Sequence, residues 1–211
     1  MSFDFSDSAI TIRSEISKAL RKEWSFLAAP GTWWSGEERV AIAAEARRAM
    51  AGEPSGDELP SAVAGVVRTV AADSPLITAQ WVADLEAEGI DPPSYVEIIG
   101  VVSRLSSADL FHIALGMSLE SLPSPQSGEP SRRRPPTDVV VGKSFVPMVR
   151  QVSIPQTLSL VPAETVAWQE LSDVMYMTLQ DMGDPDFRHA LHRTQMELVA
   201  ARTSQINECF Y

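Results

Sequence analysis

Two features of the sequence predict an all-α protein built as a helical bundle. Apolar residues recur at helical spacing along most of the chain, and the alternating pattern typical of strands is nearly absent. The composition agrees with a folded protein, because 45% of the 211 residues are apolar and 21% are charged. A chain of this length can bury a sizeable core without disulfides or a structural metal.

Helical spacing and end signals place the first two helices. A helix is predicted over residues 8–28 and should end at Pro30 and Gly31, because neither residue favours a continuing helix. A second helix should begin at Ser35, since Glu38 follows three residues later in the capping-box pattern, and run to about Met50. The apolar stripe of the first helix consists of Ile12, Ile16, Leu20, Trp24 and Leu27.

Three more helices are predicted before residue 117. Two cover about 58–72 and 75–88, and Gly89 closes the second of them. A fifth helix should start with Asp91 as its N-cap and Pro92 and Pro93 in its first turn. Its apolar stripe follows helical spacing and consists of Tyr95, Ile98, Ile99, Val102 and Leu105.

The helical pattern breaks between residues 118 and 153. This segment holds six prolines and the basic cluster Arg132, Arg133 and Arg134, so it is predicted to be a long connector. These arginines are interpreted as solvated side chains of a loop whose positive charge offsets the negative charge of the rest of the chain or pairs with its carboxylates. Anion binding is the alternative. Helices should resume at about 163–181 and from 184 or 185 to about 207. The predicted organisation is an N-terminal helical repeat (1–117), the connector (118–153) and a C-terminal repeat (154–211).

Charge and composition exclude several classes of function. The formal net charge of −11 repels phosphate backbones and anionic lipid surfaces, so neither nucleic acid nor a membrane is an expected partner. No signal peptide or membrane-spanning run is apparent, which predicts a soluble cytoplasmic protein. The single cysteine, Cys209, suits a reducing compartment and cannot supply a multi-thiolate metal site, so no metal or other cofactor is expected.

An offset of 100 positions aligns two parts of the chain with each other. The segment Tyr95-Val-Glu-Ile-Ile-Gly-Val-Val then lies on Gln195-Met-Glu-Leu-Val-Ala-Ala-Arg, with Glu97 opposite Glu197. In the same register Asp109 lies opposite Cys209, and His112 lies opposite position 212. This match indicates either a true internal repeat or a short coincidence.

The chemistry of Cys209 requires help from its surroundings. A thiol reacts as thiolate, and a pKa of about 8.5 leaves only a small fraction ionised at neutral pH. On one straight helix, the separation between Glu197 and Cys209 would be about 18 Å. Contact between them therefore requires a break, for which Asn207 is the expected place.

The string from Met196 to Tyr211 resembles the alkylhydroperoxidase and carboxymuconolactone decarboxylase-like superfamily. The motif of that superfamily reads Glu, eleven residues, Cys-x-x-Cys, three residues, His. Four other segments of this chain also look like the two-repeat members of the superfamily: those around Tyr95, Phe111-His112, Gly128-Glu-Pro-Ser-Arg and Phe145-Val-Pro-Met. The resemblance implies a thiol-dependent peroxidase that takes a hydroperoxide substrate and a thiol reductant and forms a homo-oligomer. It assigns Glu197 to the proton relay and Cys209 to the first cysteine, as the catalytic residues.

The same resemblance places a second thiol at position 212 and a histidine at 216, beyond Tyr211. A selenocysteine at 212, with its codon read as a stop, would give such a chain. We therefore expect a C-terminal repeat that is truncated within the motif, with an incomplete core and absent or impaired activity.

Less specific interpretations accompany each of these residues. The first-repeat candidates are either a relic site or ordinary structural groups: Glu97, Asp109 and His112. A lone cysteine is more often a small buried apolar residue than a nucleophile. The pair Trp33-Trp34 is interpreted as core or oligomer contact, with a pocket lining as the alternative. The alternative function is a non-catalytic helical oligomer or small-molecule-binding protein; a cysteine-independent lactone decarboxylase is weaker, because Cys209 would be incidental.

Overall fold

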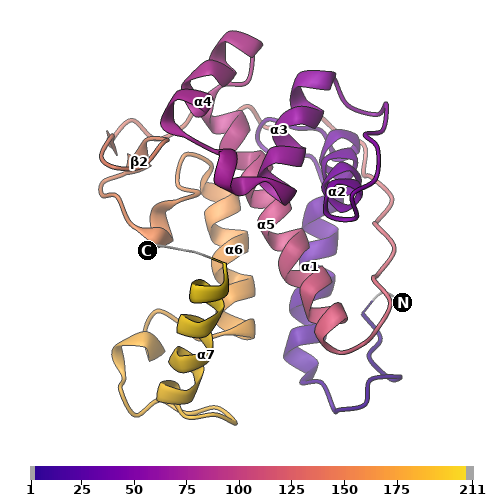
Figure 1. Cartoon of the computed structure of the whole chain (residues 1–211), viewed down its shortest axis with the longest axis vertical. Coiled ribbons are helices and arrows are strands. Elements are labelled where there is room, and N and C mark those ends of the chain that lie inside the picture. The colour runs from indigo at the N-terminus through magenta and orange to yellow at the C-terminus, as the bar shows by residue number, and fades with distance from the viewer. Residues whose placement is uncertain (1–2, 208–211) are drawn as a thin grey trace. The chain divides into compact units, whose positions relative to one another are not determined.

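The computed structural model describes residues 3–207 and confirms the all-α fold class. Its α-helices, labelled in Figure 1, are α1 (Ser14–Ala28), α2 (Gly36–Met50), α3 (Ser61–Ala72), α4 (Ala79–Asp84), α5 (Pro92–Ala114), α6 (Pro162–Met175) and α7 (Arg193–Ile206). The strands β1 (Val139–Val140) and β2 (Met148–Val149) form one antiparallel pair. No described helix is both long enough and apolar enough to cross a bilayer.

Two capped helix starts, those of α2 and α5, lie where the sequence predicts them. At α2 the Ser35 hydroxyl accepts from Glu38 N at 3.2 Å, and the Glu38 carboxylate accepts from Ser35 N at 2.8 Å, which is a complete capping box. At α5 the Asp91 carboxylate accepts from Ser94 N at 2.9 Å. These side chains satisfy amides that the first helical turn leaves without a partner.

Two other predicted helices begin later or break. The first begins at Ser14 rather than residue 8, and Phe3, which lies before it, is fully buried with its ring 4.8 Å from that of Trp24. The predicted helix over 75–88 is divided into η1 (Ser74–Leu76), α4 and η2 (Leu85–Glu88), because Thr78 caps a new helix at Trp81 N.

The C-terminal helices are also shorter than predicted. A turn that Thr178 and Asp181 close with a 2.7 Å hydrogen bond follows α6. The last helix begins at Arg193 instead of residue 184 or 185, where His192 and Gln195 form its capping box. A local turn therefore ends α6 early, and a local cap delays the start of α7, although the apolar pattern of the sequence extends further in both cases.

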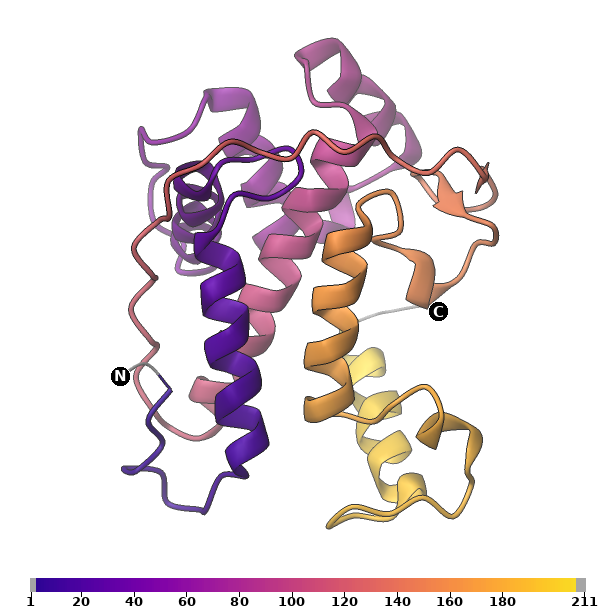
Figure 2. The ribbon, with the colours of Figure 1, turned by 180° about the vertical axis from the view of Figure 1, so that it is seen from behind.

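The chain divides into two compact units between Leu171 and Ser172. In the first unit α5 lies between α1 and α6 in the back view (Figure 2), and α2 packs on α1, α3 and α5. Its fully buried apolar residues include Leu20, Ile42, Val67, Val96 and Ile98. The second unit contains α7, none of whose residues is buried. The two-repeat organisation with boundaries at 117 and 153 stays a prediction.

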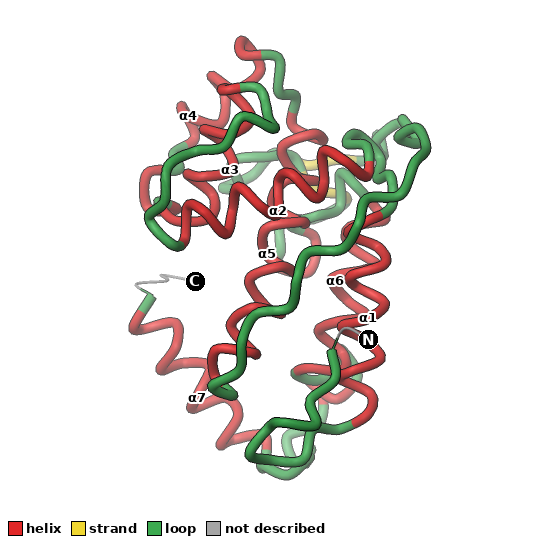
Figure 3. The backbone as a smooth tube through the Cα atoms, turned by 90° about the vertical axis from the view of Figure 1, so that its right-hand side faces the viewer, coloured by secondary structure: helices red, strands yellow, loops and turns green. Residues whose placement is uncertain are grey.

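The predicted connector is a long loop between α5 and α6, drawn in green in Figure 3 and interrupted by the β1–β2 pair. Main-chain hydrogen bonds attach it to the loop that joins α1 to α2. Gln126 N donates to Ala28 O at 2.8 Å, Ser131 N donates to Gly31 O at 3.0 Å, and Arg132 N donates to Thr32 O at 2.9 Å. The connector thus holds the loop at residues 31–33 in place.

Replacing Ser35 by Ala removes one half of the capping box of α2. We expect the variant to lose about 1 kcal/mol of unfolding free energy, since Glu38 N then has no side-chain acceptor. Urea denaturation of both proteins measures this loss. Ser107→Ala, an exposed site within α5, is the control and should change stability by less than about 0.5 kcal/mol. Equal effects of the two substitutions would contradict the capping role.

Candidate functional site

The predicted catalytic residue Glu197 lies on α7, with its side chain 46% exposed. Its carboxylate oxygen is 3.5 Å from Arg193 Nε, one helical turn earlier. Tyr176, which follows α6, lies close enough to the same carboxylate to feel its charge. Cys209, the predicted nucleophile, lies outside the described residues.

The surroundings of Glu197 affect Tyr176 in turn. Burial and the neighbouring negative charge of Glu197 both raise the pKa of the Tyr176 phenol, while Arg193 opposes the shift. The phenol therefore stays protonated at neutral pH. The Glu197 side chain, 46% exposed, keeps access to solvent.

Glu97, the residue that corresponds to Glu197 in the proposed repeat, has the opposite environment. Its side chain is fully buried, and Oε1 accepts from Arg39 NH1 at 2.6 Å. Oε2 accepts from Trp33 N at 2.7 Å and from Thr32 N at 3.1 Å. Glu97 therefore joins α5 to α2 and to the loop between α1 and α2.

Glu97 belongs to a larger group of buried charges that we name the buried charge network: Glu23, Arg39, Glu97, Arg104 and Glu164. Arg39 NH1 also donates to Glu164 Oε1 at 2.8 Å, and Arg104 NH2 lies 2.6 Å from Glu164 Oε2. Arg104 Nε donates to Glu23 Oε1 at 2.7 Å. The five side chains come from α1, α2, α5 and α6, and none is more than 6% exposed.

Aromatic and glycine residues complete the surroundings of the network. The ring of Phe26 lies 4.8 Å from the guanidinium carbon of Arg39 and 5.1 Å from that of Arg104. A Cβ atom at Gly31 would lie 1.8 Å from Glu97 Oε1, and one at Gly100 would lie 2.3 Å from Glu164 Oε2. Both positions therefore require glycine for the carboxylates to come this close to the backbone.

Asp109 and His112 form a second, separate group near the end of α5. Arg47 holds the Asp109 carboxylate with two hydrogen bonds of 2.8 and 2.7 Å. The buried His112 ring contacts Ala108 O through Nδ1 at 2.8 Å and packs against Phe3 and Phe5, with ring centroids 5.5 and 5.1 Å away. These contacts hold the C-terminal end of α5 against α2 and the N-terminal segment.

The structure does not bring Glu97 together with Asp109 and His112. Glu97 and Asp109 lie twelve residues apart on the unbroken helix α5, which corresponds to about 18 Å along its axis. A proton relay that joins these three predicted first-repeat residues directly therefore has no support in the geometry.

Four members of the buried charge network were not among the predicted site residues: Glu23, Arg39, Arg104 and Glu164. A signal for two of them exists in the sequence. Glu23 directly precedes Trp24, a residue of the apolar stripe of α1. Arg104 lies between the buried residues Val101 and Leu105. A charge inside an apolar stripe indicates burial with a partner, because an unpaired charge there is costly. The identity of the partner depends on tertiary packing.

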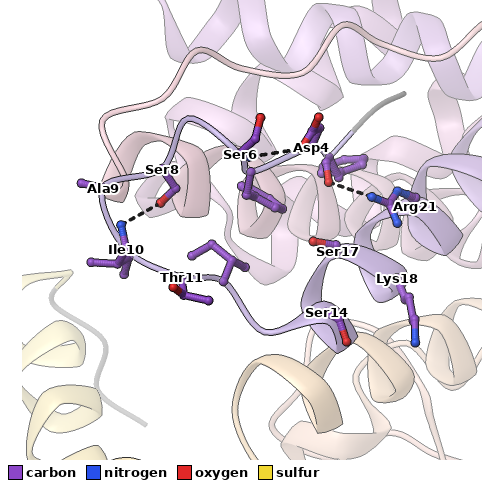
Figure 4. Close-up of a pocket in the computed structure, with 13 residues that line it drawn as sticks. Asp4, Ser6, Ser8, Ala9, Ile10, Thr11, Ser14, Ser17, Lys18 and Arg21 are labelled. Atoms are coloured by element: carbon purple, nitrogen blue, oxygen red, sulfur yellow. Dashed lines mark hydrogen bonds between the residues drawn. The ribbon is translucent and has the colours of Figure 1, made fainter.

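Three pockets of about 520, 710 and 330 Å³ lie in the first unit. Hydroxyl-bearing residues line much of the 520 Å³ pocket between the N-terminal segment and α1 (Figure 4), where Ile10 N donates to Ser8 Oγ and Arg21 donates to Phe3 O. None of Glu97, Asp109 or His112 lines any of the three. Within residues 3–207, no group of three His, Cys, Asp or Glu side chains is placed to hold a metal ion.

The chain matches no family model, and searches of curated proteins and of solved structures likewise give no match.

Two mid-helix glycines offer a direct test of the packing around Glu164. Gly100→Ala should lower the unfolding free energy by about 1–3 kcal/mol, since its new methyl group displaces a carboxylate held by two arginines. Gly65→Ala on α3 is the matched control, because a Cβ there meets nothing within 4 Å. It should stabilise the protein by about 0.5–1 kcal/mol through helix propensity. Chemical denaturation of both variants measures these changes in unfolding free energy, which should have opposite signs. Stabilisation by Gly100→Ala would contradict tight packing at Glu164.

Proposed function

We propose that the protein is a thiol-dependent peroxidase in which Cys209 reduces hydroperoxides and Glu197 relays protons. Support comes from the motif-like string Met196–Tyr211, which resembles the alkylhydroperoxidase and carboxymuconolactone decarboxylase-like superfamily. The same resemblance supports self-association of the chain, and the single cysteine supports a reducing, cytoplasmic location. The observation that carries the proposal is the environment of Glu197.

That environment separates the two related glutamates. A relay carboxylate must take up and release protons, and Glu197 is half exposed and lies beside Tyr176. Glu97 is sealed by Arg39 and two backbone amides, which suits a structural role. The contrast favours the C-terminal half as the catalytic half and assigns the first-repeat residues to structure.

The proposed chemistry balances with an external thiol as reductant. The Cys209 thiolate attacks one peroxide oxygen, the O–O bond breaks, and the departing alkoxide takes a proton to become an alcohol. Sulfur is thereby oxidised to a sulfenic acid. One thiol then forms a mixed disulfide with Cys209 and releases water, and a second thiol restores the Cys209 thiol and leaves as a disulfide. Glu197 takes the proton of the Cys209 thiol before the attack and supplies it to the alkoxide.

A second candidate is a non-catalytic helical protein that assembles or binds a small molecule. The observation in its favour is that Glu97, Asp109 and His112 are all buried in structural contacts. The two candidates differ in whether Cys209 reacts with peroxide.

Trapping of the sulfenic acid tests the proposal. Treatment with one equivalent of a hydroperoxide and a dimedone-type nucleophile should label Cys209, with mass spectrometry as the readout. Cys209→Ser should abolish the label, and Glu197→Gln should slow its formation about 100-fold or more because the proton relay is lost. Glu86→Gln, an exposed glutamate of η2, should label at the rate of the parent protein. A Cys209 that stays unlabelled, or labels equally fast without Glu197, would favour the non-catalytic candidate.

A further inference from the structure

The buried charge network contains three carboxylates and only two guanidinium groups. Glu23, Glu97 and Glu164 face Arg39 and Arg104, so the network with all groups ionised carries a net charge of −1. The exposed fractions of four members are 0 to 1%, and that of Glu23 is 6%. An uncompensated charge in such a place is costly, because the interior solvates it poorly.

The three carboxylates differ in how many donors stabilise their ionised form. Glu97 accepts from Arg39 and from the amides of Thr32 and Trp33. Glu164 lies between the two guanidiniums, with 2.8 Å to Arg39 and 2.6 Å to Arg104. Glu23 has one donor in this network, Arg104 Nε, so its ionised form is the least stabilised of the three.

The charged groups that act most strongly on Glu23 belong to this network. Arg104 comes from α5, Glu164 from α6 and Arg39 from α2. On α1 itself, the neighbouring Lys22 is exposed and pairs with Glu170 at the surface. The second cluster on α5 is already compensated, because Arg47 and Asp109 neutralise each other. Within residues 3–207, the ion pairs of the three carboxylates are therefore with Arg39 and Arg104 alone.

We propose that the buried charge network is an internal proton-binding site that keeps one proton on Glu23 at neutral pH. The proton makes the network neutral and lets the four helices close on it. Glu23 is also the member with residual exposure, which gives the proton a route to solvent. The network thereby makes the stability of the first unit depend on pH.

The direction of this dependence follows from the folded and unfolded pKa values. Burial raises the pKa of Glu23 above its ordinary value, and Arg104 only partly opposes the shift. The folded protein thus binds more protons than the unfolded chain above the ordinary pKa of a glutamate. The stabilisation is fully present below that pKa and is lost as the pH rises through the raised pKa of the folded state.

Denaturation at a series of pH values from 5 to 9 tests the proposal, using parent protein, Glu23→Gln and the control Glu170→Gln. Glutamine has the shape and neutrality of a protonated glutamate. In the parent and the control, the unfolding constant should rise with pH by up to tenfold per unit relative to Glu23→Gln, which lacks this proton. At the alkaline end Glu23→Gln should be the most stable of the three. Identical pH slopes in all three proteins would overturn the proposal.

A spectroscopic measurement keeps the proposal testable if Glu23→Gln does not fold. The infrared carbonyl band of a buried protonated carboxyl group should be present in the parent protein at pH 7 and should disappear as the pH is raised before unfolding begins. Glu164→Gln, which also removes one negative charge, should lack the band. Absence of the band from the parent protein at pH 7 would overturn the proposal, as would a band that persists in the folded Glu23→Gln variant.

Discussion

The buried pairing of Glu97 and Glu164 with Arg39 and Arg104 is the interaction on which the first unit depends. It joins α2, α5 and α6, reaches α1 through the pairing of Arg104 with Glu23, and fixes the loop between α1 and α2 through the amides of Thr32 and Trp33. Removing one partner from such a group leaves an uncompensated charge in the interior and typically destabilises a protein by about 3–5 kcal/mol. Apolar packing of the same volume would hold the helices together equally well, so the network adds mainly a requirement for one arrangement of the four helices.

The two halves of the chain use similar sequence in different ways. Glu97 lies in the interior of a long helix and is neutralised on every side, whereas Glu197 lies on a helix with no buried residue and keeps access to solvent. The side-chain neighbours determine this difference, because both glutamates lie in the second turn of a helix. Arg39 and two backbone amides hold Glu97 in place, whereas Glu197 lies beside Tyr176 with about half of its side chain exposed.

Several features that depend on nearby residues were predictable from the sequence, although the local caps at Thr78 and His192 were missed. The fold class, the cap at Ser35 and Glu38 and the start of α5 at Asp91 are set by contacts within four residues, and the structure confirms them. The later start of α1 was not predictable, since it depends on Phe3 packing against Trp24 far along the chain. Among the site residues, Glu97 was selected from the repeat pattern, but its partners Arg39 and Glu164 come from distant segments. Charged residues at such positions usually face solvent, so only tertiary packing identifies them as buried.

The long connector has a consequence for the order of folding. Short segments join the consecutive helices from α1 to α5, whereas Glu164 reaches the two arginines only after the chain has passed through the whole segment between α5 and α6. Closing such a loop is entropically unfavourable and occurs after local helix pairs have formed. We therefore expect α6 to dock last, onto an intermediate of the preceding helices in which the guanidinium groups still keep part of their hydration.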